Sequence, residues 1–369
     1  MQNNINRVLI VSGGTGGHIF PAAVFGKWLE DNKQAEVFYM CGSRELELEI
    51  YKSLSIAPYK LSLSGSPLGS RSPVKIFKRL YELLKSFYEA LKIINKIKPD
   101  YIFLFGGYIS FMPLVIAKLK HVKLIVHEQN AAAGRVTRIA AKLGVPIAAG
   151  WQECFGIEKI KFITAGIPVR EPIKYSRSDA IKKLNIPAET ANKLLSKNIK
   201  IIGVAGGSLG SRSLMNKIFD AAGELSAAAQ SLEHEYYFLM LGDAPKDYDL
   251  NLNNIYFTGR QWDMNPFYSL CNALICRAGG STLAEALTWQ IPAISVPWPG
   301  AAENHQVRNA NCFYDLGGGL VYHEDQEDAR LAELIIKLFA MPHELKLINL
   351  KPCEALAKLA DTALIGLQE

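Results

Sequence analysis

Short hydrophobic runs alternate with longer amphipathic stretches along the first half of the chain. The runs are short and carry few charges, which is typical of parallel strands buried on both faces. The expected strands cover residues 7–12, 36–41, 101–105, 123–127 and 161–165. The stretches between them predict helices near 18–31, 44–54, 75–97 and 134–143. Strands that alternate with helices in this way predict a doubly wound α/β domain.

A second series of the same kind follows. Its expected strands lie near 199–204, 236–241, 255–258, 273–276 and 292–296, and its helices near 211–225, 279–289 and 303–314. Pro168 and Pro172 disfavour regular structure between the two series. We therefore expect one domain over residues 1–168 and another over 169–349. Helical patterns near 327–340 and 353–367 end the chain, and we expect the last one, within about 350–369, to pack back onto the first domain.

Three glycine-rich turns each follow a predicted strand and precede a predicted helix. They are Gly13–His18, Gly206–Gly210 and Arg277–Thr282. Glycines let the backbone approach a ligand closely, and a helix start offers unpaired N–H groups with partial positive charge. Such turns suit phosphates. Because they occur in both halves, we expect an α/β fold with two Rossmann-like doubly wound domains that face a cleft.

Composition and charge narrow the class of function. Hydrophobic residues make up 49% of the chain and charged residues 21%, which predicts a packed globular protein. The net charge of +6 suits an anionic ligand or an anionic membrane surface and is no signature of nucleic-acid binding. The six cysteines have no CxxC spacing, which favours buried thiols over disulfides or a zinc site. No cleavable signal precedes the first strand, which predicts a cytoplasmic location.

His18 follows the first turn, and its imidazole is a candidate general base. It is expected in the first turn of the following helix, where an imidazole can accept a proton from a hydroxyl near neutral pH. A structural role, in which His18 only caps the turn, is an equal alternative. The turn departs from the dinucleotide fingerprint, because Ile19 stands where GxGxxG has its third glycine. We therefore expect no nicotinamide or flavin cofactor.

Other polar residues are placed where a nucleotide sugar can bind. Thr282 and Glu285 lie three residues apart, on one face of the predicted helix. The carboxylate can accept two sugar hydroxyls, or it can simply complement the helix dipole. Polar groups also begin the next predicted helix. Others follow two buried strands, at the carboxyl ends where parallel sheets bind ligands. These groups lie at 303–306, 106–110 and 127–130.

Residues 73–98 predict a basic amphipathic helix. The segment holds six lysines and one arginine against two glutamates, a net charge of +5. Apolar residues recur at helical spacing in excess of one core face: Phe77, Leu80, Leu84, Phe87, Leu91 and Ile94. Such a helix can lie on anionic lipid, or it can be a core helix with a solvated basic face.

Taken in order, seven motifs resemble those of the MurG family of bacterial glycosyltransferases. They are Gly13–His18, Gly106–Ser110, His127–Asn130, Gly166–Arg170, Gly206–Gly210, Arg277–Glu285 and Glu303–Gln306. The resemblance runs nearly end to end and implies the GT-B fold. It also implies transfer of N-acetylglucosamine from UDP-N-acetylglucosamine to the 4-hydroxyl of undecaprenyl-pyrophosphoryl-N-acetylmuramyl-pentapeptide. The enzyme would be peripheral, at the cytoplasmic face of the inner membrane.

The resemblance implies roles for individual residues. Glu285 would hold the uridine ribose, while Ser208 and Arg170 would lie at the diphosphate with Thr282 nearby. Gln306 and His305 would contact the sugar. From the first domain, Asn130 and the turn residues Thr15, Gly16 and Gly17 would approach the sugar and phosphate. Arg277, Leu283 and Gln261 also belong to donor-site motifs, and Gln261 stands where the family commonly has an apolar residue.

The implied reaction inverts the anomeric centre and needs no metal or other cofactor. His18 would be the base, and the helix starts with Arg170 would stabilise the departing diphosphate. The first domain's glycine turns would receive the acceptor's diphosphate, and the 73–98 helix would rest on an anionic membrane. Two alternatives stay open: another UDP-sugar enzyme, such as an epimerase or a glycolipid synthase, and a non-catalytic nucleotide-sugar-binding scaffold.

Overall fold

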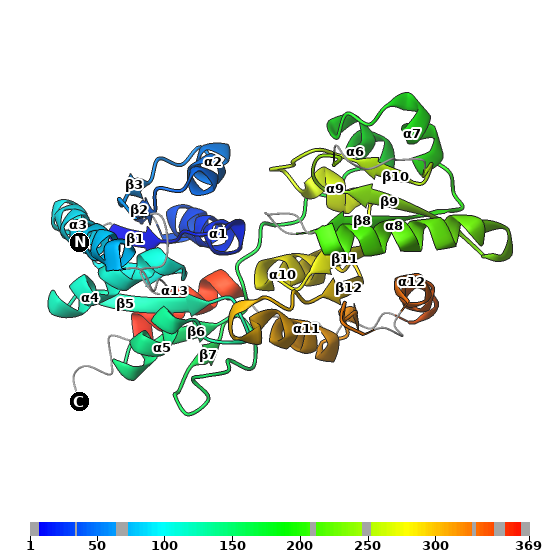
Figure 1. Ribbon diagram of the computed structural model, residues 1–369. Coiled ribbons are helices and arrows are strands. Elements are labelled where there is room, and N and C mark those ends of the chain that lie inside the picture. Colours follow the sequence, from blue (N-terminus) through cyan, green and yellow to red (C-terminus); the bar gives the residue numbers. More distant parts are fainter. Residues whose placement is uncertain are drawn as a thin grey trace. The chain divides into compact units, whose positions relative to one another are not determined.

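The computed structural model divides the chain into two compact units, which we describe separately (Figure 1). It describes residues 7–33, 35–63, 73–206, 212–245, 252–326, 330–342 and 351–362 of the 369. The first unit contains Met1–Arg170 and Ile348–Glu369, and the second contains Glu171–Leu347. The end of the chain therefore belongs to the same unit as its beginning.

The first unit is built on a seven-stranded parallel sheet with the order β3-β2-β1-β4-β5-β6-β7. Its strands are β1 (Arg7–Val11), β2 (Glu36–Cys41), β3 (Tyr59–Lys60), β4 (Tyr101–Leu104), β5 (Lys123–Glu128), β6 (Ile147–Ala149) and β7 (Ile163–Thr164). Its helices are α1 (Gly16–Lys33), α2 (Glu45–Ser53), α3 (Pro73–Ile97), η1 (Tyr108–Ser110), α4 (Phe111–Leu119), α5 (Arg135–Lys142) and α13 (Pro352–Thr362).

The hydrophobic runs become central strands because both of their faces are covered. Val8 to Val11 of β1 are all buried, with β2 and β4 paired on either side. The C-terminal helix α13 packs against α1 and β5, and its Leu356 is completely buried. The last described helix therefore contributes to the core of the first unit.

The second unit repeats this plan with a six-stranded parallel sheet of order β10-β9-β8-β11-β12-β13. Its strands are β8 (Ile199–Ala205), β9 (Glu235–Met240), β10 (Ile255–Phe257), β11 (Ala273–Arg277), β12 (Ala293–Val296) and β13 (Gly319–Val321). Its helices are α6 (Arg177–Lys183), α7 (Ala188–Leu194), α8 (Arg212–Ala227), η2 (Ala229–Ser231), α9 (Asn265–Leu270), α10 (Gly280–Trp289), η3 (Ala302–Asn304), α11 (His305–Asp315) and α12 (Leu331–Ala340).

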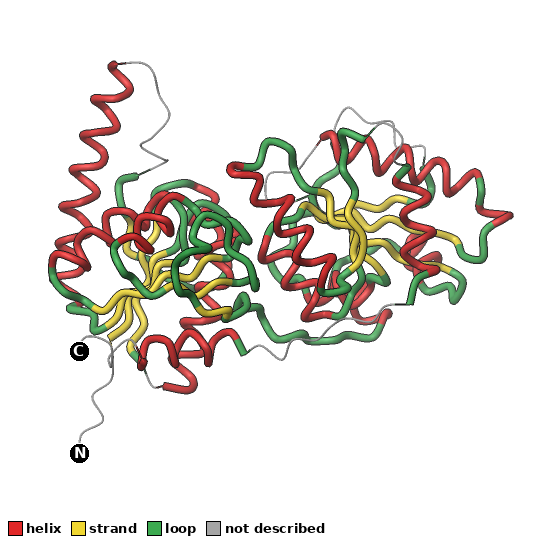
Figure 2. Tube along the Cα trace, turned by 90° about the horizontal axis from the view of Figure 1, so that it is seen from below, coloured by secondary structure: helices red, strands yellow, loops and turns green. Residues whose placement is uncertain are grey.

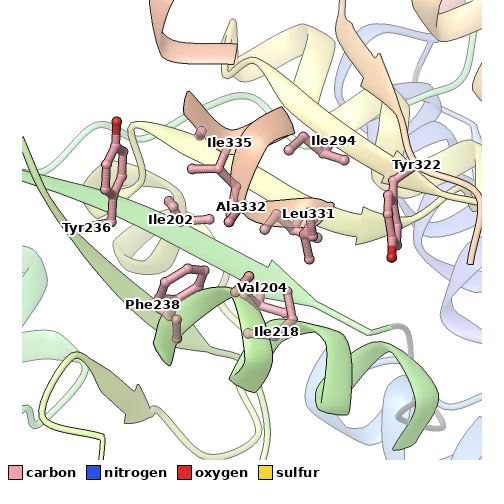
Figure 3. Packing of buried hydrophobic residues seen from close by; sticks show 14 of the residues in the cluster. Ile202, Val204, Ile218, Tyr236, Phe238, Ile294, Tyr322, Leu331, Ala332 and Ile335 are labelled. Carbon is pink, nitrogen blue, oxygen red and sulfur yellow. The ribbon is translucent and has the colours of Figure 1, made fainter. Parts of the chain in front are cut away.

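A single hydrophobic cluster joins this second sheet to two of its helices (Figure 3). Ile202, Val204 and Phe238 extend from β8 and β9 toward Ile218 of α8 and Ile335 of α12. The strands contribute apolar residues from continuous runs, and the helices contribute them at helical spacing, so the alternating sequence pattern supplies both sides of this cluster.

Both sheets reverse their strand order at the first strand of the unit. β1 lies between β2 and β4, and β8 lies between β9 and β11. Reversal of the connection leaves a crevice beyond the carboxyl ends of these strands, and open α/β sheets bind their ligands there. The three glycine-rich turns follow β1, β8 and β11. The two predicted Rossmann-like folds are confirmed, and the turns after β1 and β11 lie at the ligand-binding edges of their sheets.

Several short elements have no signal in the hydrophobic pattern. The pattern predicts no helix between Pro172 and Ile199, yet α6 and α7 form there. Ser176 caps α6, because its hydroxyl accepts the N–H of Asp179 at 3.1 Å. The two-residue strand β3, the three-residue strands β6 and β13, and α9 are likewise too short to show a clear period. The strand expected over 161–165 does form, as β7, but only at Ile163–Thr164.

The helix predicted over 75–97 is α3, whose N-terminal half projects beyond the rest of the first unit (Figure 2). Its C-terminal half enters the core through Ala90, Ile94 and Ile97. Tyr81, Leu84 and Tyr88, in contrast, are 67%, 63% and 68% exposed, and we name these three side chains the α3 stripe. Phe87 and Leu91 are half-buried, and the side chains of Phe77 and Leu80 lie outside the described residues. None of the described helices is long and apolar enough to cross a bilayer.

Candidate active site

A buried carboxylate holds the first glycine-rich turn in place. Glu47 of α2 accepts the N–H groups of Gly14 and Gly42, both at 2.8 Å, and the hydroxyl of Tyr108 at 2.7 Å. Burial, and next the bond to Glu47, raise the pKa of Tyr108 well above its ordinary value, so the phenol stays a donor. Three donors compensate the buried charge. The N–H of Gly14 is therefore engaged within the protein.

His18 lies in the first turn of α1, as its sequence position predicts. Its main-chain N–H donates to Thr15 O at 3.1 Å, and Nδ1 of its half-buried ring lies 2.7 Å from Oε1 of Gln129. The ring lies beside a second glycine turn, since a Cβ on Gly106 would be 3.2 Å from its Cε1 and Nδ1 atoms. Gly106 has a φ of 86°, a left-handed conformation that favours glycine. Glycine therefore makes room for the His18 ring.

Behind His18, two side chains of the β5 edge continue the hydrogen bonding. Nε2 of Gln129 lies 2.8 Å from Nδ1 of His127 and 3.1 Å from the main-chain oxygen of His127. Nε2 of His127 lies 2.8 Å from the main-chain oxygen of Gly166. Burial lowers the pKa of His127 to about 4, so this imidazole is neutral near pH 7.

Glu128 organises the loop that carries Asn130. Its carboxylate accepts the N–H of Gly134 at 3.0 Å and the hydroxyl of Thr137 at 2.6 Å. The same carboxylate accepts the main-chain N–H of Asn130 at 3.1 Å and the side-chain amide at 3.2 Å. The position of Asn130 is therefore set by a neighbouring buried acid.

The predicted phosphate contacts of the first unit gather at the start of α1. Thr15 precedes Gly16 and Gly17, which open the helix. A Cβ on Gly16 would lie 2.9 Å from the ring of Phe20, so a larger residue would displace that ring. Arg170 places its guanidinium carbon 4.9 Å from the centre of the same ring, a cation–π contact. The structure therefore assigns Arg170 a contact within the first unit.

In the second unit, Glu285 has a buried tyrosine behind it. Tyr268 of α9 donates its hydroxyl to Oε2 of Glu285 at 2.6 Å. Burial, and next the charge of Glu285, raise the pKa of Tyr268 well above its ordinary value, so the phenol remains protonated. The ring of Tyr268 also packs on Trp289, with centroids 5.5 Å apart. The carboxylate is therefore oriented by a rigid aromatic donor.

Arg277 lies at the end of β11 and is tied into the protein interior. Its guanidinium forms an ion pair with Glu324 and donates to Ser213 at 3.1 Å. The side chains of Arg277 and Glu324 are 6% and 10% exposed, so the pair is desolvated. The resemblance to the MurG family implies that Arg277 is a donor-binding residue. The structure gives its guanidinium these partners within the second unit.

The side chains of three further donor-site candidates face different surroundings. The hydroxyl oxygen of Thr282 would lie 3.8 Å from a Cβ on Gly279, so it faces the turn that opens α10. Leu283, in contrast, is fully buried and its N–H bonds to Gly279 O within the helix start, so its side chain belongs to the core. Gln261 donates its amide to Thr258 O at 2.6 Å and closes its own loop. Ser208 lies outside the described residues.

The loop before α11 has unusual backbone geometry. Glu303 and Asn304 have φ values of 57° and 52°, in the left-handed region that non-glycine residues rarely adopt. His305 then begins the helix, and Gln306 accepts the N–H of Trp298 at 2.9 Å. The buried amide of Asn309 donates to Ala278 O at 2.9 Å. Asn309 therefore ties α11 to the third glycine turn.

The polar groups that shape these turns come from distant parts of the chain. Glu47, Tyr268 and Asn309 stand in none of the seven motifs, and Gln129 lies in the motif His127–Asn130 without an expected role of its own. Their positions follow from the fold, because hydrogen bonds join them to Gly14, Glu285, Ala278 and His18 across sequence separations of 17 to 111 residues. Among the side chains that the structure describes, no group of three or more His, Cys, Asp or Glu residues could hold a metal ion.

Comparison with known proteins identifies the family. Residues 8–144 match the glycosyltransferase family 28 N-terminal domain, and residues 201–363 match its C-terminal domain. The chain therefore belongs to glycosyltransferase family 28. Within it, the chain is similar to proteins named UDP-N-acetylglucosamine–N-acetylmuramyl-(pentapeptide) pyrophosphoryl-undecaprenol N-acetylglucosamine transferase. The one from Desulfotalea psychrophila is 32% identical, over 90% of this chain and 88% of its own, and the one from Phocaeicola vulgatus is 28% identical, over 98% and 94%.

Solved structures agree on the fold. MurG of Acinetobacter baumannii superimposes with a TM-score of 0.62 at 22% identity, over 96% of this chain and 93% of its own. UDP-GlcNAc 2-epimerase of Methanocaldococcus jannaschii reaches a TM-score of 0.61 at 12% identity, over 96% and 99%. The predicted GT-B fold and the resemblance to the MurG family are confirmed.

Proposed function

We propose that the protein transfers N-acetylglucosamine from UDP-N-acetylglucosamine to the 4-hydroxyl of undecaprenyl-pyrophosphoryl-N-acetylmuramyl-pentapeptide, a step of peptidoglycan synthesis. One observation carries this proposal: relatives that bear the name of this transferase match the chain over about nine-tenths of its length. A match of that extent includes residues of both units, whereas a shared fold alone fits epimerases equally well.

The donor binds the second unit in this proposal. Glu285 accepts the ribose hydroxyls, and its orientation by Tyr268 at 2.6 Å supports that role. The diphosphate lies at the start of α10, where helix N–H groups and partial positive charge favour anions. Thr282 faces this turn, and Gln306 and His305 at the start of α11 meet the sugar hydroxyls. Arg277 supports the site through its ion pair with Glu324.

The acceptor is activated by the first unit. His18 is the base that takes the proton of the attacking hydroxyl, and its hydrogen bond to Gln129 supports this assignment because a base must be held in a fixed orientation. Asn130, held by Glu128, approaches the reacting sugar. Glu47 occupies the N–H of Gly14, so the acceptor's diphosphate is met by Thr15, Gly16 and Gly17 at the start of α1.

The departing UDP is stabilised without a metal or another cofactor in this proposal. Helix starts and Arg170 supply the positive potential that the developing charge requires. Activity assayed in excess EDTA tests this point. Full turnover is expected, and loss of turnover that added magnesium or manganese restores would contradict it.

The acceptor's lipid tail requires a membrane, and the α3 stripe supports peripheral binding to the cytoplasmic face of the inner membrane. Tyr81, Leu84 and Tyr88 recur on one side of a projecting helix. Lys85, Lys92 and Lys96 are exposed on the same helix. Exposed aromatic and aliphatic groups beside lysines are suited to the interface of anionic lipid.

One assay tests the proposed function directly. Purified protein is mixed with radiolabelled UDP-N-acetylglucosamine and the lipid-linked muramyl-pentapeptide, and the lipid fraction is counted. We expect label in the lipid, and His18→Ala should lower turnover by ~10²–10⁴-fold while UDP still binds. Conversion of the donor to an epimerised UDP-sugar would identify an epimerase. UDP-sugar binding without any turnover would identify a binding scaffold, and either result would overturn the proposal.

A further inference from the structure

We propose that Gln129 and His127 are positioning residues that fix the neutral tautomer of His18, so that its Nε2 atom is the one that accepts the hydroxyl proton. The inference rests on the proposed function, since it specifies how the base of that reaction is held. The three side chains form one hydrogen-bonded series that ends at the main-chain oxygen of Gly166.

The main-chain oxygen of Gly166, at the end of the series, determines which ring nitrogen of His127 carries the hydrogen. A carbonyl oxygen can only accept, so Nε2 of His127 carries the hydrogen that bonds to Gly166 O at 2.8 Å. The ring is completely buried and lies against Phe105, with centroids 5.1 Å apart. Its lowered pKa, about 4, leaves one ring hydrogen near pH 7. Nδ1 of His127 therefore carries a lone pair.

The orientation of Gln129 follows from two acceptors. One end of its amide lies 2.8 Å from Nδ1 of His127 and 3.1 Å from the main-chain oxygen of His127. Both atoms accept, so that end must be the amide nitrogen, which has two hydrogens to give. The amide oxygen then faces His18. The two acceptors of His127, its Nδ1 atom and its main-chain oxygen, require the same orientation of the amide.

The orientation of Gln129 in turn determines the tautomer of His18. Its Nδ1 atom lies 2.7 Å from the amide oxygen of Gln129, which can only accept, so Nδ1 carries the hydrogen. A neutral imidazole has one N–H, and its lone pair is therefore on Nε2. Gly106 leaves the space for this bond, since its Cβ position is 3.2 Å from the His18 ring and 3.6 Å from Oε1 of Gln129.

The series orients the base and transfers no proton itself, because an amide does not relay protons. As the acceptor oxygen bonds to C1 of N-acetylglucosamine, the bond from C1 to the diphosphate breaks and UDP leaves with its electron pair. The hydroxyl proton passes to Nε2 of His18, and the imidazolium keeps its Nδ1–H bond to Gln129. In the other tautomer the lone pair would face Gln129, and the hydroxyl would meet an N–H.

Nitrogen NMR of the histidines tests the tautomer without any substrate. Protein labelled with ¹⁵N-histidine, at mildly alkaline pH, gives two-bond ¹H–¹⁵N correlations that distinguish Nδ1–H from Nε2–H rings. His18→Ala and His127→Gln identify the two sets of signals. We expect His18 as the Nδ1–H tautomer and His127 as the Nε2–H tautomer. His18 found as the Nε2–H tautomer would overturn the inference.

Two substitutions at one position then separate positioning from general structural support. Gln129→Met removes the acceptor, and we expect His18 to lose its Nδ1–H preference and kcat to fall ~10²-fold with KM for UDP-N-acetylglucosamine within about 2-fold. Gln129→Glu in its protonated form keeps an oxygen that accepts from Nδ1–H and a hydroxyl that donates toward His127, and it should restore the tautomer and most of the rate.

Gln152→Met, at an exposed position of the same unit, is the matched control and should change neither readout. A Gln129→Met enzyme that kept both the Nδ1–H tautomer and the normal kcat would refute the positioning role. A wild-type protein with no transferase activity would instead overturn the proposed function and leave the tautomer result standing.

Discussion

At the scale of single residues, buried polar side chains hold the glycine turns in shape. Glu47 binds the first turn of the first unit, and Asn309 binds the third glycine turn of the chain through Ala278. Glycine allows the backbone to take many conformations, so an outside partner is needed to select one. The partners are supplied by helices that follow other strands. The shape of the ligand-binding edge of each sheet therefore depends on tertiary contacts with other elements.

Replacing Glu47 with leucine should destabilise the first unit strongly. The change leaves the N–H groups of Gly14 and Gly42 without their acceptor, at about 1–3 kcal/mol for each buried donor, while the Tyr108 hydroxyl keeps Leu63 O at 3.2 Å. We expect a loss of at least about 2 kcal/mol in the free energy of unfolding, measured by urea denaturation. Glu45→Leu, at an exposed position of the same helix, should change it by less than about 0.5 kcal/mol. Equal effects of both variants would contradict the role of Glu47.

Tyr268→Phe should weaken UDP binding by about tenfold, because the hydrogen bond to Glu285 is worth about 1.5 kcal/mol when one partner is charged. The ring stays in place against Trp289, so the fold is retained. Isothermal titration calorimetry with UDP measures the change in Kd. Tyr314→Phe, at an exposed position of the second unit, is the control. An unchanged Kd for Tyr268→Phe would show that Glu285 does not depend on the phenol.

His127 should make the protein sensitive to mild acid. Its folded pKa of about 4 lies below its ordinary 6.5, so as the pH falls from 6.5 to 4 the unfolded chain takes a proton that the folded chain does not. Burial dominates the shift, while Gly166 and Glu128 oppose it and His18 adds to it. Stability is full above pH 6.5 and falls by about 3 kcal/mol toward pH 4. Urea denaturation of the wild type and His127→Gln across this range should show the difference, and parallel curves would contradict it.

At the scale of elements, the sequence predicts the strands and helices that have a clear hydrophobic pattern and misses the short elements that have none. The central strands β1, β8 and β11 are continuous apolar runs, and the glycine turns after them are unmistakable. α6 is stabilised by a Ser176 cap and a few buried side chains, which leave no periodic signal over seven residues. The candidate site shows the same division. His18 and Glu285 stand in motifs, whereas Tyr268, 17 residues before Glu285, is recognised only once α9 packs beside α10.

The helix α3 shows how far periodicity can go. Its apolar residues predict a helix with more apolar surface than one core face needs, and the structure separates the two sets: Ile94 is buried while Leu84 is exposed. The pattern alone cannot make this separation, because the helix leaves the core halfway along its length (Figure 2). The exposed set, rather than the whole periodic series, is the one to test for membrane contact.

Replacing Tyr81, Leu84 and Tyr88 together with serine should reduce binding to vesicles of phosphatidylglycerol at least ~10-fold, because each side chain contributes about 1.5–3 kcal/mol when fully buried in an apolar phase. Sedimentation with vesicles measures the bound fraction. Leu195→Ser combined with Tyr314→Ser, both exposed in the second unit, is the control. The melting temperature should be unchanged in both variants. Unaltered vesicle binding by the triple variant would show that the α3 stripe is not the anchor.

At the scale of the whole molecule, the chain uses one α/β plan twice and gives each copy a different task. The strand order around β8 repeats the order around β1. The first copy adds His18 with its hydrogen-bonded series, and the second adds Glu285 with Tyr268. The helix α13 then returns to the first unit, so the second unit is a continuous insertion between two parts of the first.

This division predicts where the nucleotide alone should act. Hydrogen exchange measured by mass spectrometry, with and without UDP at about 100 times its Kd, should show slower exchange at the start of α10 and around 258–261. Peptides from β1, α1 and β5 should exchange almost unchanged, because UDP stabilises the unit that it binds by about 2.7 kcal/mol at that concentration. Glu285→Gln is the matched control and should reduce the protection. Protection confined to the first unit would show that the donor binds there, and it would refute the proposal that the second unit binds the donor.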